Sequence, residues 1–203
     1  MLLSSSATPI FFTQHIDMQE KPFNEKEDKI VIIHADGGLD GLHLVSPSNN
    51  YYYQKYRPNI KKIFESKRSQ LPLNYSLGNE DFFLNPDALE FYKLFKENTL
   101  SFIHAIGLKN SYKKHYEAIR FYRKCLLDLS NNGYSFIASQ NLQQELEMIA
   151  ENIITNKKTK PITLINYNGW DHHNNLPSEF GMKIKELSYA VSMFWKKVIK
   201  NQE

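Results

Sequence analysis

Acidic, imidazole and hydroxyl side chains gather in three short segments of the chain. These segments are DGGLDGLH over residues 36–43, GLKNSYKKH over residues 107–115 and NGWDHHNN over residues 168–175. Asp171 and His173 are two positions apart, so in extended backbone both side chains point to the same side. A carboxylate and an imidazole placed in this way can share one divalent metal, zinc for example, at about 2.0–2.2 Å. Asp40 would add a third ligand from a separate loop.

A purely structural role for the same residues stays open. Asp and His are common in loops that follow strands, where they cap helices or face water. Gly37, Gly38 and Gly41 permit a tight backbone with positive φ beside a ligand. Their spacing differs from that of the dinucleotide-binding fingerprint, and the sequence contains no P-loop. The segments therefore predict a metal site rather than a dinucleotide site.

Short apolar runs precede the three polar segments and predict buried strands. The runs are Lys29–Ala35 (KIVIIHA), Leu100–Ile106 (LSFIHAI) and Pro161–Tyr167 (PITLINY). Continuous apolar runs of this length are typical of central strands in a parallel sheet that is covered on both faces. Because ligands of open parallel sheets bind beyond the carboxyl ends of the strands, the polar segments are expected along one edge.

Helical patterns separate and follow these runs. The predicted helices begin near Asn85, which precedes Pro86 as an N-cap, and extend over His115–Leu129, Ser139–Asn156 and from Pro177 onward. Alternating strands and helices predict an α/β fold, a three-layer sandwich with a mostly parallel central sheet. Residues 1–28 are expected to form an N-terminal extension, and residues 29–203 a single α/β domain. The polar, tyrosine-rich stretch 49–79 is expected to be a surface excursion with one short helix near Tyr52–Tyr56.

The composition is that of a globular protein, and together with the charge it indicates which classes of partner are not expected. Hydrophobic residues make up 41% of the 203 residues and charged residues 23%, with a formal net charge of +3. Because the basic residues are spread along the chain, no nucleic-acid partner is expected. No apolar run is long enough to span a bilayer, and the single cysteine, Cys125, excludes an internal disulfide. The N-terminus lacks the basic n-region of a signal peptide, which leaves the localisation unknown, cytoplasmic as the sequence stands.

Five motifs occur in one order along the chain and carry a resemblance. They are GGLDGLHLVSP, YYQKYRP, LNPDALEFYKLFKENTLSFIHAIGLKN, LQQELEMIAENI and NGWDHHNN. In this order they are similar to the bacterial family called domain of unknown function 1501, a branch of the alkaline-phosphatase and sulfatase superfamily. The resemblance covers almost the whole chain from Lys29 onward. It implies an α/β sandwich with metals at the strand ends, hydrolysing phosphate or sulfate esters, in proteins that are often exported.

The resemblance also implies roles for single residues. Asp40, Asp171 and His173 match metal ligands, for which zinc or manganese would be the cofactor. His115 matches the histidine of the family's Ser-His-Phe motif and would be catalytic. The serine of that motif is replaced by Lys114. Ser111, three positions away, is the serine that would act as a nucleophile.

The departures from the family decide what we expect of the function. Family members continue to a Ser-Glu-Phe-Gly-Arg segment and an Asp-His-Gly motif, whereas this sequence ends at Glu203. We therefore expect an incomplete alkaline-phosphatase-like fold that acts as a non-catalytic remnant or binding module. The alternative is a metal-dependent phosphoester or sulfoester hydrolase, completed by a second chain or by a homodimer. A surface-interaction protein unrelated to the superfamily is the third possibility.

Overall fold

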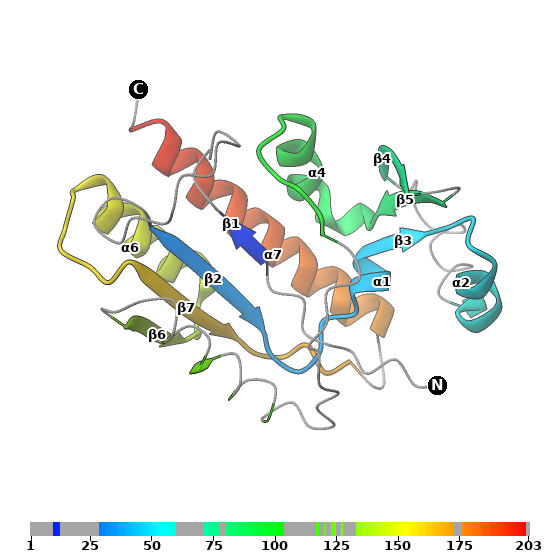
Figure 1. Ribbon diagram of the computed structural model, residues 1–203, viewed down its shortest axis with the longest axis horizontal. Coiled ribbons are helices and arrows are strands. Elements are labelled where there is room, and N and C mark those ends of the chain that lie inside the picture. The colour runs from blue at the N-terminus through cyan, green and yellow to red at the C-terminus, as the bar shows by residue number, and fades with distance from the viewer. Residues whose placement is uncertain are drawn as a thin grey trace. The chain divides into compact units, whose positions relative to one another are not determined.

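The computed structural model describes six stretches of chain and five further residues. These are residues 10–12, 29–59, 71–77, 80–103, 133–172 and 176–201, together with Glu117, Arg120, Arg123, Lys124 and Leu127. Figure 1 shows the elements in chain order. The contacts between residues divide the chain into two compact units. Each unit is described below by itself. Unit 1 comprises residues 1–39, 103–171 and 193–203, and unit 2 comprises residues 40–102 and 172–192.

Unit 1 contains a four-stranded sheet in the order β1-β2-β7-β6. Its strands are β1 (Ile10–Phe12), β2 (Ile30–Ala35), β6 (Tyr134–Ala138) and β7 (Ile162–Tyr167). β7 pairs in parallel with both β2 and β6, and β1 pairs antiparallel with β2. The strands predicted in 29–35 and 161–167 and the mostly parallel α/β sheet are thus confirmed. β1, inside the predicted N-terminal extension, and β6 were not predicted.

The central strands form because their apolar runs are buried. Val31, Ile32 and Ile33 of β2 and Leu164 and Ile165 of β7 are each at most 5% exposed. Each such side chain contributes about 1.5–3 kcal/mol when it is transferred out of water. The two strands end at the same edge of the sheet, and their register places His34 opposite Asn166.

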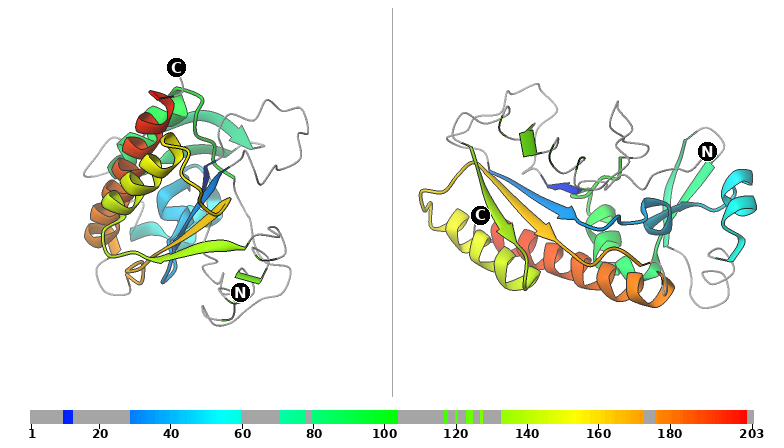
Figure 2. Two further views of the ribbon diagram at one scale, coloured as in Figure 1. Left: turned by 90° about the vertical axis from the view of Figure 1, so that its left-hand side faces the viewer. Right: turned by 90° about the horizontal axis from the view of Figure 1, so that it is seen from below.

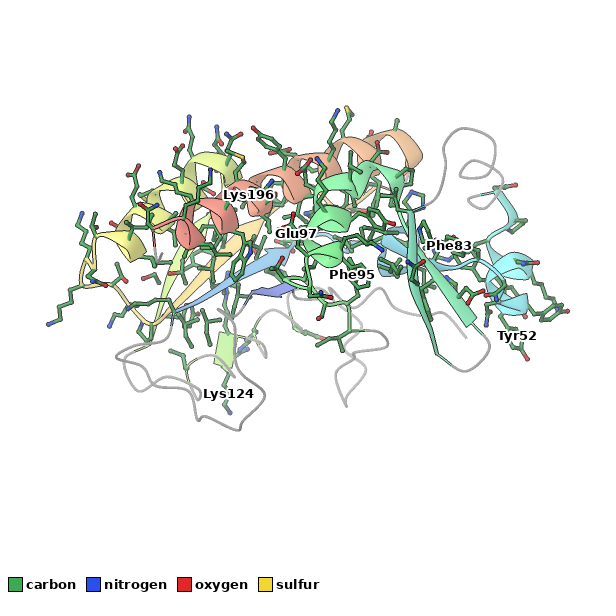
Figure 3. All side chains as sticks on the ribbon, turned by 90° about the horizontal axis from the view of Figure 1, so that it is seen from above. Tyr52, Phe83, Phe95, Glu97, Lys124 and Lys196 are labelled. Carbon is green, nitrogen blue, oxygen red and sulfur yellow. The ribbon has the colours of Figure 1, made fainter. Side chains whose placement is uncertain are left out.

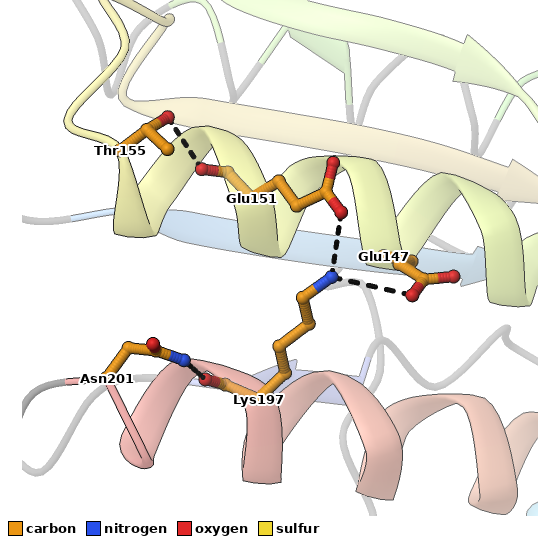
Figure 4. Close-up of polar contacts among 5 residues, drawn as sticks. All are labelled: Glu147, Glu151, Thr155, Lys197 and Asn201. Carbon is orange, nitrogen blue, oxygen red and sulfur yellow. Dashed lines mark hydrogen bonds and ion pairs between the residues drawn. The ribbon is translucent and has the colours of Figure 1, made fainter.

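Two helices cover one face of this sheet. α6 (Leu142–Ile154) and the C-terminal end of α7 (Leu176–Ile199) lie side by side along it (Figure 2). Lys197 of α7 reaches Glu151 and Glu147 of α6, with Nζ to Oε1 distances of 2.9 and 3.4 Å (Figure 4). The hydrogen bond to Glu151, followed by the other interactions with both carboxylates, raises the pKa of Lys197. This contact links the two helices at their exposed surfaces.

Unit 2 contains a smaller antiparallel sheet and several short helices. The sheet has the order β3-β5-β4, with β3 (Val45–Pro47), β4 (Leu71–Leu77) and β5 (Glu80–Leu84). The helices are α1 (Gly41–Leu44), α2 (Tyr51–Tyr56), the 3-10 turn η1 (Pro86–Ala88) and α4 (Leu89–Lys96). Figure 3 labels Phe83 on β5 and Phe95 on α4, two half-buried rings of this unit.

Most of the helices predicted from the sequence are present. Asn85 caps η1 as expected, since its Oδ1 accepts from the backbone N of Asp87 at 2.9 Å. The apolar stripe predicted for the last helix is buried in α7; it comprises Phe180, Ile184, Leu187, Val191 and Phe194. Five residues of the predicted helix 115–129 are described, and all five are helical.

Two sequence predictions differ from the structure. In the described part of the strand predicted over residues 100–106, Leu100 to Ile103, the backbone is irregular, so this prediction is wrong there. Leu100 is buried and Phe102 packs against Phe95, but Ser101 and Ile103 are exposed, Ile103 by 65%. The stretch 49–79 contains the predicted short helix, α2, but also strand β4, which was not expected.

Candidate functional site

A chain of side-chain hydrogen bonds lies at the carboxyl ends of β2 and β7. Nδ1 of His34 is 2.8 Å from Oδ1 of Asn166, its cross-strand neighbour. Nδ2 of Asn166 donates to Oδ2 of Asp36 at 3.0 Å and to Oδ1 of Asn168 at 2.7 Å. We call His34, Asp36, Asn166 and Asn168 the strand edge. All four belong to unit 1.

The hydrogen bonds around Asn166 determine which of the neighbouring atoms donate and which accept. Its amide nitrogen faces two oxygen acceptors, so its Oδ1 faces His34 and can only accept. Nδ1 of His34 therefore carries a proton and donates to Asn166. Asn166 in turn holds one oxygen of the Asp36 carboxylate in place. The network thus aims a carboxylate along the edge where ligands of parallel sheets bind.

The backbone around Asp36 is tied to the loop after β7. The backbone N of Asp36 donates to the carbonyl of Tyr167 at 3.0 Å, and the N of Trp170 donates to the carbonyl of Asp36 at 3.2 Å. Gly37 has φ +108°, and a Cβ there would lie 2.8 Å from the backbone N of Asp171. Only glycine fits this approach. The two loops are therefore in contact, which brings the backbones of Asp36 and Asp171 to the same edge.

Asp40, the third predicted metal ligand, lies in unit 2 and has a structural role there. Its Oδ1 caps α1 by accepting from the backbone N of Leu42 at 3.1 Å and of His43 at 3.2 Å. Its Oδ2 forms an ion pair with Nη1 of Arg57. Both oxygens are engaged, so a metal bound at Asp40 would have to displace Arg57.

His43 is buried against an aromatic ring. Its imidazole is 4.5 Å from the ring of Phe180 in an edge-on arrangement, and the residue is 2% exposed. Burial lowers the pKa of His43 to about 4, and the charges of Asp40 and Asp87 only partly oppose this because Arg57 and His172 act in the same direction as burial. His43 is therefore neutral at pH 7 and belongs to the core of unit 2.

His172 lies on the same aromatic ring as His43. The ring centroids of His172 and Phe180 are 6.2 Å apart, again edge-on, and Nδ1 of His172 is 3.2 Å from Oε2 of Glu179. The side chain of Glu179 is 47% exposed, whereas that of His172 is 4% exposed. We call His43, His172 and Phe180 the histidine cluster.

The predicted site residues are only partly covered by the described chain. Asp40 falls in unit 2 and Asp171, whose side chain is exposed, in unit 1. His173, His115 and Ser111 lie outside the described residues. Among the residues that are described, no group of three or more His, Cys, Asp or Glu is arranged to hold a metal ion. The set of Asp40, Asp171 and His173 stays a prediction.

Sequence reasoning missed Asn166, the centre of the strand edge. It lies inside the run PITLINY and was treated as part of a buried strand. A polar amide one residue before the end of an otherwise apolar strand is a usable signal, because a buried amide requires hydrogen-bond partners. Its partner His34 occupies the equivalent position in KIVIIHA.

Comparisons with known proteins give no relative. No protein-family model matches the chain, and neither does any curated protein or solved structure. Within the described chain, no helix combines the length and the apolar character needed to cross a bilayer.

Proposed function

We propose that this chain is a binding module whose ligand lies at the strand edge and is held by Asp36 and Asp171. The observation that carries the proposal is the hydrogen-bond chain His34–Asn166–Asp36 at the carboxyl ends of two parallel strands. Preorganised polar groups at that edge are the usual ligand site of an open α/β sheet. The five motifs that resemble the alkaline-phosphatase-like family support an origin in such an enzyme.

The chemistry of the edge fits a divalent cation. The contact of Gly37 with the Asp171 backbone brings the backbones of Asp36 and Asp171 to the same edge, and oxygen and imidazole donors suit zinc or manganese. His173, two positions after Asp171, would complete the set. Asn166 would act as an outer partner that orients the Asp36 carboxylate. Asp40 fits less well, because its carboxylate already caps α1 and pairs with Arg57.

In this role the chain binds a divalent ion and orients the carboxylates that hold it. It supplies no nucleophile. A bound divalent ion supplies Lewis-acid charge at the edge of the sheet. Asp36 holds its position through Asn166, and Asp171 is carried by the loop that Gly37 contacts. A partner that presents an anionic group would be recognised by that charge.

Metal binding by the purified chain tests the proposal. We expect near-stoichiometric zinc or manganese by mass spectrometry, with the affinity measured by calorimetry. Asp36→Asn and Asp171→Asn should each remove most of the binding, and Asn166→Ala should weaken it by about 10–100-fold, as loss of an outer partner does. Asp40→Asn is the matched control, since asparagine keeps the helix cap and removes the charge that pairs with Arg57.

Three results would decide against the strand edge. A folded chain that binds neither metal would overturn the proposal. Binding that survives both Asp36→Asn and Asp171→Asn would also overturn it. Loss of binding in Asp40→Asn, with Asp36→Asn unaffected, would instead favour the ligand set predicted from the sequence.

A further inference from the structure

Helix α2 presents three of its four tyrosines to solvent. Tyr51, Tyr52 and Tyr56 are 65%, 65% and 70% exposed, whereas Tyr53 is 6% exposed. Tyr53 anchors the helix, and its backbone N donates to the N-cap side chain of Asn50 at 2.9 Å. Figure 3 shows Tyr52 projecting away from the body of the helix. The aromatic rings are therefore held on a fixed support with their faces in water.

The exposed rings are arranged together with a cation. Tyr52 and Tyr56 are stacked, with centroids 6.4 Å apart and planes inclined by 4°, and Tyr51 meets Tyr52 edge-on at 5.3 Å. Nζ of Lys55 lies 5.6 Å from the ring centre of Tyr51 and 5.5 Å from that of Tyr56. We call Tyr51, Tyr52, Tyr56 and Lys55 the tyrosine platform. Three of the six residues of α2 are exposed aromatic residues, whereas apolar residues on an ordinary protein surface are scattered singly.

The sequence segment that contains the platform is rich in basic residues. From Gly41 to Phe64 the sequence contains no Asp or Glu, while it contains Lys55, Arg57, Lys61 and Lys62, of which Arg57 forms an ion pair with Asp40. Such a segment attracts anions, although the net charge of the whole protein is only +3. We expected no nucleic-acid partner because the basic residues are spread along the whole chain. This segment is a local exception, since it contains no acidic residue.

We propose that the tyrosine platform binds single-stranded nucleic acid. Bases stack on aromatic side chains and phosphates pair with nearby cations, and this combination is the usual basis of sequence-tolerant single-strand binding. A duplex hides the faces of its bases, and an acidic peptide without aromatic residues has no ring to stack. A neutral glycan has no charge to pair with Lys55. Single-stranded nucleic acid is the ligand that uses both the rings and the charge.

Fluorescence anisotropy with a labelled twelve-residue oligothymidylate tests the platform in the full-length chain. Tyr52→Ala and Tyr56→Ala should each weaken binding about tenfold, because stacking on one base is worth that much. Tyr52→Phe and Tyr56→Phe should leave binding within about twofold, since phenylalanine keeps the stacking face. Tyr189→Ala, which removes a 46% exposed tyrosine of α7, is the matched control and should bind as the parent chain does.

Two comparisons separate stacking from charge alone. An abasic strand of the same length should bind at least about tenfold more weakly, and Lys55→Gln should lower the slope of log affinity against log salt by about one. Binding to the oligothymidylate that is absent, or that is unchanged in the double variant Tyr52→Ala/Tyr56→Ala, would overturn the proposal. Equal affinity for the abasic strand or for polyglutamate would also overturn it, because either would show a general polyanion surface. Circular dichroism confirms that each variant is folded.

Discussion

His34 and His43 lie close together in the sequence, yet the two units use them differently. His34 takes part in a hydrogen-bonded network at the end of β2 and β7, where polar groups fix one another. His43 is buried against Phe180, where the loss of water lowers its pKa to about 4. The same residue type thus serves an edge in unit 1 and a core in unit 2. The difference shows that the role of a histidine near the end of a strand depends on the groups that surround it rather than on its position in the sequence.

Removal of the ring between the two buried histidines should have the largest effect. Phe180 is fully buried and lies within 4.5 and 6.2 Å of the rings of His43 and His172. Phe180→Ala should lower the free energy of unfolding by about 3–5 kcal/mol, measured by urea denaturation. Phe83→Ala, at a half-buried ring, should cost clearly less. A loss below about 1 kcal/mol for Phe180→Ala would show that the histidine cluster is not a core.

Acid should destabilise the protein through His43. The unfolded chain binds a proton near pH 6.5 and the folded chain only near pH 4, so stability is present above pH 6.5 and is lost as the pH falls to 4. The full contribution is about 3 kcal/mol for a shift of this size. His43→Gln should remove that part of the pH dependence between 6.5 and 4. Equal slopes for both chains would contradict the buried, neutral assignment.

Two glycine substitutions compare backbone strain with and without a close contact. Gly37→Ala places a methyl group 2.8 Å from the Asp171 backbone at φ +108°, whereas Gly133→Ala at φ +69° meets nothing within 4 Å. We expect losses of about 2–3 and about 1 kcal/mol, respectively. The difference, measured by thermal unfolding at matched conditions, reports the contact between the two loops of unit 1. Equal losses would mean that the loops do not depend on this contact.

The hydrogen-bond network of the strand edge should contribute least to stability. Asn166→Ala removes three hydrogen bonds and should cost about 1–2 kcal/mol, since Asp36 and Asn168 can be rehydrated whereas His34 is buried. Asn168→Ala, at an exposed position that accepts one of these bonds, should cost less than about 0.5 kcal/mol. A larger loss for Asn168→Ala than for Asn166→Ala would remove Asn166 from the centre of the network.

The parts of the fold with strong local signals were predictable. Strands β2 and β7 are short, mostly apolar runs rich in β-branched residues, and α6 and α7 carry apolar residues at helical spacing. Asn85 before Pro86 fixed the start of η1. Such features depend on near neighbours in the sequence, so a single sequence is sufficient to find them.

The parts that depend on distant partners were not predictable. β4 contains Pro72 and an asparagine, Asn74, with φ +55°, and its strand character comes from pairing with β5. The run from Leu100 has strand composition, yet its described residues pair with no strand. The strand edge was found only in part, since the register that brings Asn166 beside His34 is set by the sheet as a whole. The role of Asp40 as an N-cap could have been predicted from the local sequence, but Asp40 was interpreted as a metal ligand instead.

On the ribosome, β2 leaves the exit tunnel long before its parallel partner β7. His34 and Asn166 of these strands are 132 residues apart, and all of unit 2 up to Phe102 is synthesised between them. Of the described strands that pair with β2, the three-residue β1 alone has been synthesised during that interval. Its remaining apolar edge is open to other nascent chains and to chaperones. The parallel centre of the sheet can therefore form only after β7 is synthesised, and we expect the closure of so long a loop to slow folding.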